Sequence, residues 1–290
     1  MIRNSIKRYG RPIVAHSAYY SGYCRLTRWQ GARIVSYHGI LDTPTNHYAI
    51  STASFTQQMQ HLAEHYTPVT VDYLVDLLHT GKPIPPRAVA VTFDDGYQDV
   101  STRAYPILQR FGIPATVFLP TALIGTRSSE RAAQGMVQTT FLTWEEVCEM
   151  SRHNITFGSH TVHHVSLAAI SRREAQYQLE QSRARLEDEI GQPVTGFAYP
   201  YGTVRDYNHE TARLVADAGY RWAVTGLSGI TNHRSNPFAL RRTKLEGGDG
   251  LAIFAQALQG ALDPWVLVDR LGGLLKRSPR TVVLDEEVAS

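Results

Sequence analysis

The chain has 290 residues, of which 43% are hydrophobic, 10% aromatic and 19% charged. This is the composition of an ordinary globular protein, and it excludes a collagen, a coiled-coil rod and a disordered chain. A chain of this length buries roughly 75% of the surface that its unfolded form exposes, so a large core can form without cross-links. Two cysteines, Cys24 and Cys148, are too few for a disulfide framework, and we expect both to be reduced thiols.

Charge is distributed unevenly along the chain. Residues 1–33 contain seven Lys or Arg and no Asp or Glu; because the whole chain carries +3 and this segment +7, residues 34–290 carry −4. Aromatic residues alternate with the basic ones, at Tyr9, Tyr19, Tyr20, Tyr23 and Trp29. Such a segment can pack loosely on the domain as a solvated extension or contact an anionic membrane surface. Contact with nucleic acid is the least favoured alternative, and no nucleic-acid partner is expected.

No stretch of the sequence approaches the roughly 18 apolar residues that a membrane-spanning helix needs. The basic N-terminus lacks the continuous apolar run of a secretory signal. The expected location is therefore the cytoplasm, with a peripheral position at the inner face of the membrane as the alternative.

Strand and helix patterns alternate after Arg33. Short apolar, β-rich runs predict strands at 34–37, 88–93, 115–119, 155–158, 196–199 and 220–225. Helical spacing of apolar residues and capping signals predict helices at 55–65, 71–80, 100–110, 143–152, 171–190 and 208–219. Pro106 lies inside the third of these helices and predicts a kink or a late start. Residues 121–140 are polar and small and are expected to form a loop or insertion.

This alternation predicts a mainly parallel sheet built from βα units. Six or seven units favour a distorted (β/α) barrel of about seven strands over a small open sheet. The predicted organisation is a basic N-terminal extension at 1–33, a catalytic domain at 34–260 and a C-terminal tail at 261–290. Active sites of such barrels lie where the strands end. Five reactive residues follow predicted strand ends, namely His38, Asp94, Asp95, His160 and Tyr201.

The sequence Thr92-Phe93-Asp94-Asp95-Gly96 places two carboxylates directly after an apolar strand. Two adjacent charges at a buried strand end repel each other and lose hydration. A bound cation offsets both costs, since one carboxylate can ligate it while the other stays free as a base. The structural alternative is an ordinary Asp-Gly turn.

A second cluster is Ser159-His160-Thr161-Val162-His163-His164. On a helical turn, His160 and His164 would project from one face, at a spacing that suits two imidazole ligands of a zinc-type ion, and His163 would point elsewhere. One Asp and two His leave a coordination position open for water. The alternative is a His-rich surface loop.

A third cluster, Phe197-Ala198-Tyr199-Pro200-Tyr201-Gly202, follows another predicted strand. Pro and Gly predict a rigid loop, whose backbone N–H groups can donate to an oxyanion. By itself this cluster is equally typical of an aromatic turn.

In this order the three clusters resemble the polysaccharide deacetylases, also called the NodB-homology family or carbohydrate esterase family four. The resemblance runs from about residue 34 to 260 and includes the segments 112–118 and 142–144. It implies that Asp95, His160 and His164 hold a divalent metal, with Zn²⁺ first and Co²⁺, Ni²⁺ or Fe²⁺ as alternatives. It further implies that Asp94 is the general base for the attacking water and that the backbone N–H of Tyr201 stabilises the oxyanion.

Two positions depart from the family pattern. Ala198 stands where the third motif usually has an arginine that orients the catalytic Asp, and Arg241 or Arg242 could supply that guanidinium. The family's C-terminal strand ending in His is also missing. Ile34-Val35-Ser36-Tyr37-His38 resembles the permuted poly-N-acetylglucosamine deacetylase subgroup, which carries this strand at its N-terminal side. We therefore predict His38 as the general acid; its alternative is a structural histidine.

The resemblance implies metal-dependent removal of N-acetyl groups from an N-acetylhexosamine-containing polysaccharide, oligosaccharide or glycolipid, with release of acetate. The expected substrate contacts are Tyr199, Pro200, Trp222 and Arg242. Two alternatives remain: an amidohydrolase acting on a small non-sugar amide, and a catalytically silent carbohydrate-binding or membrane-associated accessory protein.

Overall fold

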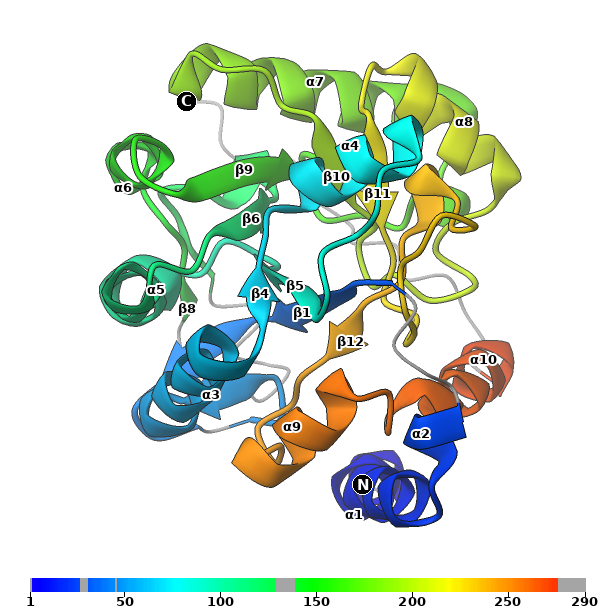
Figure 1. Ribbon diagram of the computed structural model, residues 1–290. Coiled ribbons are helices and arrows are strands. Elements are labelled where there is room, and N and C mark those ends of the chain that lie inside the picture. Colours follow the sequence, from blue (N-terminus) through cyan, green and yellow to red (C-terminus); the bar gives the residue numbers. More distant parts are fainter. Residues whose placement is uncertain (1, 27–30, 45, 129–138, 276–290) are drawn as a thin grey trace.

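A curled parallel sheet forms the centre of the protein (Figure 1). The structure is a computed structural model that describes residues 2–26, 31–44, 46–128 and 139–275. The strand order is β11-β10-β9-β6-β5-β1-β12, and the short β4 pairs with β5. The bounds are β1 (Arg33–Tyr37), β4 (Thr67–Pro68), β5 (Ala88–Phe93), β6 (Ala115–Leu119), β9 (Ile155–Ser159), β10 (Gly196–Ala198), β11 (Trp222–Val224) and β12 (Thr243–Lys244).

Residues 240–244 bridge the two edges of this sheet. Leu240 exchanges backbone hydrogen bonds with Ala223 and Thr225 on the β11 side, at 2.9 and 2.8 Å. Three residues later, Thr243 is paired with Val35 of β1. One short segment thus contacts both edge strands, and the sheet is the predicted distorted (β/α) barrel with an incomplete closure at this point.

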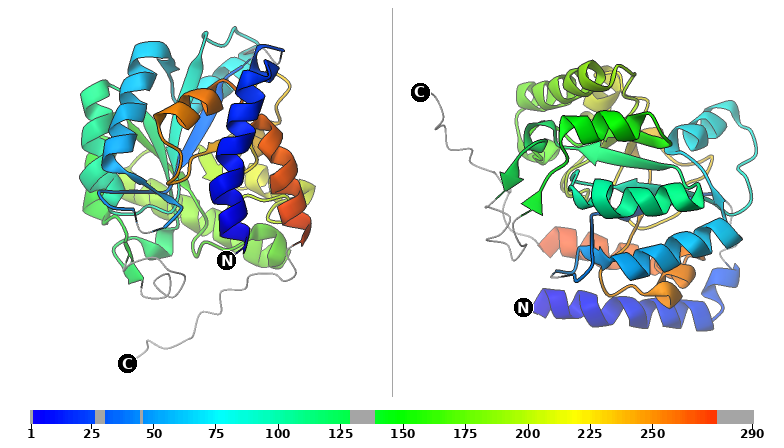
Figure 2. Two further views of the ribbon diagram at one scale, coloured as in Figure 1. Left: turned by 90° about the horizontal axis from the view of Figure 1, so that it is seen from below. Right: turned by 90° about the vertical axis from the view of Figure 1, so that its left-hand side faces the viewer.

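Helices cover the outside of the barrel (Figures 1 and 2). They are α3 (Thr52–His65), α4 (Val71–Thr80), α5 (Tyr105–Phe111), α6 (Trp144–Ser151), α7 (Arg172–Ile190) and α8 (His209–Asp217). Four further helices come from the chain ends: α1 (Ile2–Tyr20), α2 (Tyr23–Leu26), α9 (Leu251–Leu258) and α10 (Val266–Leu275). Two small sheets pair β2 (Gly39–Leu41) with β3 (Ala49–Ser51) and β7 (Arg127–Ser128) with β8 (Thr139–Thr140).

The capping signals explain where several helices begin and end. Thr143 and Glu146 form the predicted capping box of α6, and Gly191 ends α7 in a left-handed conformation. Ser171 caps α7 as predicted, but Glu174 accepts from the Gln178 side chain instead of completing a capping box. Residues Val100–Ala104 form a π-helical turn, and α5 starts at Tyr105, so Pro106 accompanies a late start. Part of the predicted 121–140 loop, residues 129–138, lies outside the described residues.

Alternating residues of the strands form two separate cores. On β5, the side chains of Val89, Val91 and Phe93 join the large cluster beneath the surrounding helices. Those of Ala88 and Ala90 face the barrel interior, where Phe118 and Trp222 fill the space with ring centroids 5.8 Å apart. Because both faces of each strand are buried, these strands are continuous apolar runs, as in other parallel sheets.

The N-terminal segment forms helices that the sequence analysis did not predict. The helix α1 lies along the outside of α9 and the turn Asp263–Trp265 (Figure 2). Ala15 and Ala18 pack there with Ile253, Ala257, Ala261 and Leu262. Arg11 is 3% exposed and donates to the Asp249 carboxylate and the Lys244 carbonyl, both at 2.7 Å. The predicted domain boundaries at 33/34 and 260/261 stay predictions.

Neither cysteine is in a disulfide, in agreement with the sequence analysis. Among the described residues, no single helix is both long and apolar enough to cross a bilayer, although Leu251–Leu258 and Asp263–Leu271 reach that composition jointly across an 85° bend.

Candidate active site

Residues that follow the strands gather at the C-terminal end of the barrel. His38 follows β1, the pair Asp94 and Asp95 follows β5, and His160 follows β9. Because all these strands are parallel, their C-terminal ends meet at one end of the barrel. The site therefore forms where the sequence analysis predicted it.

Asp95, His160 and His164 form a three-ligand cluster. One potential ligand atom from each lies within 4.8 Å of the others. The Asp95 Oδ1 atom is 3.1 Å from His164 Nε2 and 3.6 Å from His160 Nε2. Two imidazoles and a carboxylate are a donor set typical of zinc and similar divalent ions. The three residues thus fit a single divalent ion.

Partners outside the cluster orient two of its ligands. His160 Nδ1 is 2.7 Å from the Ala198 carbonyl, so a proton on Nδ1 leaves Nε2 free to ligate. The Tyr97 hydroxyl donates to Asp95 Oδ2 at 2.7 Å. Burial is the largest cause that lowers the pKa of His160 to about 4, and the charge of the neighbouring His164 is the second. The imidazole of His160 is therefore neutral at pH 7, which is the form that binds metal.

The two histidines do not project from a helical turn, so that part of the prediction is wrong. Residues 160–165 form an irregular loop in which Thr161 and His164 have positive φ angles. Gln178 of α7 holds this loop, since its side-chain oxygen accepts from the backbone N–H groups of Val162 and His163, both at 3.0 Å. The loop, rather than helical spacing, turns both imidazoles toward Asp95. His163 points elsewhere, as predicted, and contacts Gln178 through Nδ1.

Backbone strain is concentrated at this end of the barrel. Non-glycine residues with positive φ include Asp95 at 74°, His164 at 57° and Tyr201 at 62°. Such conformations cost on the order of 1–3 kcal/mol each and cluster at functional sites. Their occurrence at two cluster ligands and at the predicted oxyanion donor marks this region as a functional site.

Position 198 holds an alanine instead of the family's usual arginine, and Arg242 supplies a guanidinium in its place. Its Nη1 and Nη2 atoms donate to the two carboxylate oxygens of Asp94, each at 2.7 Å. Both side chains are buried, at 2% and 5% exposure. Burial alone would raise the pKa of Asp94, but the charge and hydrogen bonds of Arg242 outweigh it and lower that pKa to about 2. Asp94 is thereby held ionised in one orientation beside the cluster.

His38 also lies close to Asp94. Its Nε2 is 3.9 Å from Asp94 Oδ2, and its side chain is 19% exposed. Burial lowers the pKa of His38 despite the opposing charges of Asp94 and Asp95, so the resting imidazole is neutral at pH 7. Its buried Nδ1 has no hydrogen-bond partner among the described residues.

A tight turn fixes the backbone at Tyr201. The Gly202 N–H donates to the Pro200 carbonyl at 2.7 Å, and Gly226 donates to the Gly202 carbonyl at 2.8 Å. N–H and C=O of a trans peptide point in opposite directions, so the Tyr201 N–H points away from the inside of the turn. The Tyr201 ring packs edge-on against His164, with centroids 4.9 Å apart.

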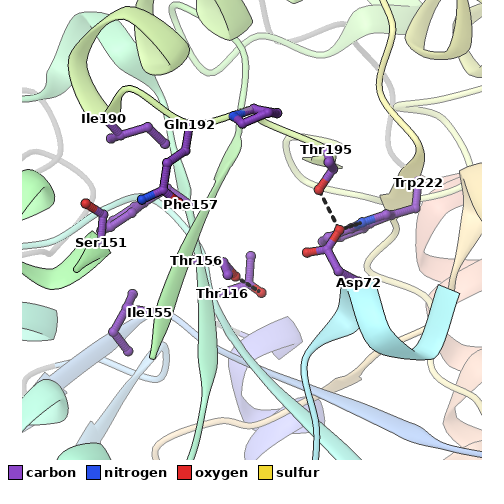
Figure 3. Close-up of a pocket in the computed structure, with 11 residues that line it drawn as sticks. Asp72, Thr116, Ser151, Ile155, Thr156, Phe157, Ile190, Gln192, Thr195 and Trp222 are labelled. Atoms are coloured by element: carbon purple, nitrogen blue, oxygen red, sulfur yellow. Dashed lines mark hydrogen bonds between the residues drawn. The ribbon is translucent and has the colours of Figure 1, made fainter. Parts of the chain in front are cut away.

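The predicted substrate contacts are buried among protein partners. Tyr199 is 1% exposed and donates to the Phe238 carbonyl, and Pro200 is buried in the turn. Trp222 lies inside the barrel and donates from Nε1 to Asp72 of α4 at 2.8 Å (Figure 3). Arg242 already donates to the Asp94 carboxylate. A contact between substrate and any of these four residues stays a prediction.

Some site residues were not predicted from the sequence. Lys244 of β12 reaches the Tyr201 carbonyl at 3.5 Å, and its charge contributes to the lowered pKa of His38. Tyr97 and Gln178 orient the cluster from outside it. Tyr97 lies two residues after Asp95 and could have been suspected, whereas the positions of Gln178 and Lys244 depend on which strands and helices are neighbours.

The protein is thus a parallel barrel with a cluster of one Asp and two His, able to hold a metal ion, at the C-terminal end of its strands. The polysaccharide deacetylase family matches residues 81–223 of the chain. The chain contains a polysaccharide deacetylase domain of the NodB-homology type, and several of its relatives are named poly-β-1,6-N-acetyl-D-glucosamine N-deacetylases.

Individual relatives agree with this assignment. The chain is 29% identical over 216 residues to YxkH of Bacillus subtilis, which is named as a polysaccharide deacetylase, covering 74% of this chain and 71% of that protein. It is 32% identical over 134 residues to a poly-β-1,6-N-acetyl-D-glucosamine N-deacetylase of Escherichia coli, covering 44% of this chain but only 20% of that protein. The fold matches the Streptococcus pyogenes deacetylase PplD with a TM-score of 0.68 at 24% identity, covering 79% of this chain and 98% of that one.

Proposed function

We propose that the protein is a metal-dependent N-deacetylase that removes acetyl groups from N-acetylhexosamine units and releases acetate. The observation that carries this proposal is the convergence of Asp95, His160 and His164 beside an ionised Asp94. Three ligands leave a position open for water, which a hydrolytic site requires. When bound there, a divalent ion, with zinc as first choice, supplies Lewis acidity toward water and the amide carbonyl.

Asp94 and His38 handle the proton in this proposal. Asp94 is ionised at neutral pH and is held by both oxygens, so it orients and deprotonates the attacking water. With a pKa of about 2 it is a weak base that does not retain the proton. The neutral imidazole of His38, 3.9 Å away, receives the proton for delivery to the leaving nitrogen.

The Tyr201 N–H serves as the oxyanion donor. It is fixed before substrate arrives, because Gly202 and Gly226 hold the turn on both sides. A Cβ at Gly202 would run into the Gly226 backbone, and Gly202 has φ +60°, so glycine is required there on both grounds. A preorganised donor of this kind contributes about 3–4 kcal/mol of transition-state stabilisation.

For the substrate, we propose a polymer or oligomer of N-acetylglucosamine, or a glycolipid that carries it. The name of the Escherichia coli relative motivates β-1,6-linked N-acetylglucosamine oligomers as the first substrate to test. A β-1,4-linked series of the same lengths tests whether the linkage matters.

The first experiment measures metal content and acetate release together. We expect about one equivalent of zinc-type ion in the wild type, a sharp reduction in His164→Ala and retention in the matched control His163→Ala. Chelation should abolish acetate release, and zinc or cobalt should restore it. Absence of bound metal in the wild type even after zinc or cobalt is added would refute the mechanism.

Variants of the proton-handling residues test the roles within that mechanism. Asp94→Asn and His38→Ala should each retain metal and lose roughly 100-fold or more in kcat. Near-wild-type turnover in His38→Ala would show that His38 is structural. Release of acetate from small non-sugar amides but not from sugars would favour the amidohydrolase alternative.

We also propose that α1 and α10 form a surface for an anionic membrane. The four most exposed large hydrophobic side chains among the described residues are Tyr20 and Ile13 of α1 and Leu267 and Leu271 of α10, at 59–77% exposure. The two helices lie beside each other (Figure 2). Residues 1–33 contain seven basic and no acidic residues; Arg11 and Arg33 are buried in ion pairs with Asp249 and Asp263, which leaves five basic residues in this segment for a surface role. Apolar and basic groups together favour the surface of a bilayer containing anionic lipids.

Vesicle flotation tests this surface. The full chain should float with vesicles that contain 30% anionic lipid and not with neutral vesicles. Leu267→Ser/Leu271→Ser should weaken flotation at least tenfold, while Tyr73→Ser/Tyr177→Ser, which changes exposed tyrosines on α4 and α7, should not. Equal flotation of both double variants, or dimerisation in solution that the first one abolishes, would contradict the membrane proposal.

A further inference from the structure

The segment that connects β2 to β3 brings an aromatic side chain to the catalytic end of the barrel. The Tyr48 ring centroid lies 5.5 Å from that of His38, and the Tyr48 side chain is 40% exposed. The His47 ring is 3.9 Å from that of Tyr48, tilted by 37°. An exposed aromatic surface therefore continues outward from the predicted general acid.

This aromatic surface is held in place by the backbone beneath it. The Asn46 side chain accepts from the N–H groups of Tyr48 and Ala49, at 2.8 and 3.1 Å. The Gly247 N–H donates to the His47 carbonyl at 2.9 Å. A Cβ at Gly247 would collide with the Ala49 carbonyl, so the segment after β12 packs directly on this turn. A partly exposed ring on a fixed turn can bind a ligand at a small entropic cost.

A second tyrosine, Tyr201, also packs against a histidine of the site. The Tyr201 ring contacts His164 at 4.9 Å, while the Tyr48 ring contacts His38. The Tyr201 ring thus packs beside the proposed metal ligands, and the Tyr48 ring packs beside His38, the proposed proton-transfer group. Flat, weakly polar ring faces with hydrogen-bonding edges match the alternating C–H faces and hydroxyl edges of pyranose sugars.

We propose that Tyr48, extended by His47, is a stacking subsite for the sugar unit adjacent to the one being deacetylated. The inference rests on the proposed function and adds to it a preference for oligomers over single sugars. Stacking on a neighbouring unit holds the chain without touching the reacting amide, so it strengthens binding of longer substrates and leaves the chemistry on a single unit unchanged.

Kinetics on substrates of increasing length test this subsite. The zinc-loaded enzyme would be assayed for acetate release from N-acetylglucosamine and from its oligomers of two to five units. We expect Tyr48→Ala to raise KM for the oligomers roughly tenfold with little change in kcat, and to leave kcat/KM for the single sugar unchanged. Tyr48→Phe, which keeps the ring, should restore the wild-type KM.

Tyr73→Ala is the matched control, because Tyr73 on α4 is exposed to a similar extent, at 46%, and is not part of the site. It should leave all these constants unchanged. An equal loss of kcat/KM on the single sugar and on the oligomers would mean that the ring acts through His38, and would overturn the subsite. Unchanged oligomer KM in Tyr48→Ala would overturn it as well.

Direct binding separates this inference from the proposed function. Calorimetric titration of the zinc-loaded protein with the five-unit oligomer should give weaker binding for Tyr48→Ala than for Tyr73→Ala. If the wild type released no acetate from any sugar but Tyr48→Ala bound the oligomer more weakly than Tyr73→Ala, the activity would be refuted and the subsite retained. If acetate were released but the two variants bound equally, only the subsite would be refuted.

Discussion

The pairing of Asp94 with Arg242 shows how a single residue can be replaced from elsewhere in the fold. Ala198 provides no guanidinium at the end of β10, and Arg242 provides one from the segment that closes the barrel. Bidentate geometry fixes the carboxylate plane as well as its charge. Arg242 also donates from Nε to the Thr225 carbonyl at 2.8 Å, so its own position is fixed by the end of β11.

Replacing Arg242 by Gln should change the pH dependence of the reaction. The pKa of Asp94 is now lowered to about 2, so Asp94 does not limit activity between pH 4 and 7. Without the guanidinium, burial dominates and the pKa rises, so the acidic limb of the kcat/KM profile should move to higher pH. At pH 7, we expect kcat to fall roughly 100-fold.

Arg241→Gln provides the control for this prediction, since Arg241 is the other arginine that the sequence offered and it is not bound to Asp94. Its pH profile should match the wild type. An unchanged acidic limb in Arg242→Gln would contradict the role that we assign to the pair.

At the scale of elements, α1 contacts the segment that carries Arg242 and Lys244. Arg11 donates to the Lys244 carbonyl and to the Asp249 carboxylate. Its Nε atom lies 4.0 Å from Glu246 Oε2. Gln58 of α3 donates to the Asp249 carbonyl at 2.9 Å, so the segment is also held from the barrel side. The N-terminal helix is thereby linked to the segment whose Arg242 side chain binds Asp94.

Arg11→Met should lower the free energy of unfolding by about 3–5 kcal/mol, because it leaves the buried Asp249 carboxylate without its cation. Urea unfolding of the metal-free protein measures this change. The exposed Arg213 of α8 gives the control, since Arg213→Met should alter stability by less than about 0.5 kcal/mol. A similar, small effect of both substitutions would show that the Arg11 contacts contribute little.

At the scale of the whole molecule, the three proposed metal ligands come from two strand ends and one loop that only the folded barrel brings together. The unfolded chain therefore has no comparable site, and metal binding should stabilise the fold. At a free zinc concentration 100 times the Kd, the gain is about 2.7 kcal/mol, or a rise in Tm of roughly 5–10 °C.

Thermal unfolding with and without zinc measures this linkage. His164→Ala should lose most of the rise, and His163→Ala should keep it. A rise of the same size in His164→Ala would place the bound zinc at some other site.

The sequence alone determined most of the strand and helix pattern of the barrel, apart from the two-residue strands β4 and β12, and the residues at its strand ends. Local signals sufficed there: continuous apolar runs for buried strands, Thr143 with Glu146 for a helix start, and Asp94-Asp95 after β5. The predicted strand-end residues, namely His38, Asp94, Asp95, His160 and Tyr201, were expected at one end of the barrel because parallel strands share a direction.

The tertiary structure decided what local signals do not encode. Arg242 was chosen over Arg241 as the partner of Asp94 because β12 pairs with β1 in a register that turns residue 242 into the barrel. Trp222 is buried inside the barrel because its strand face points inward toward Phe118. The irregular turn at His164 depends on Gln178 of α7. Each outcome depends on contacts between residues far apart in the chain, and periodicity and capping signals report only on near neighbours.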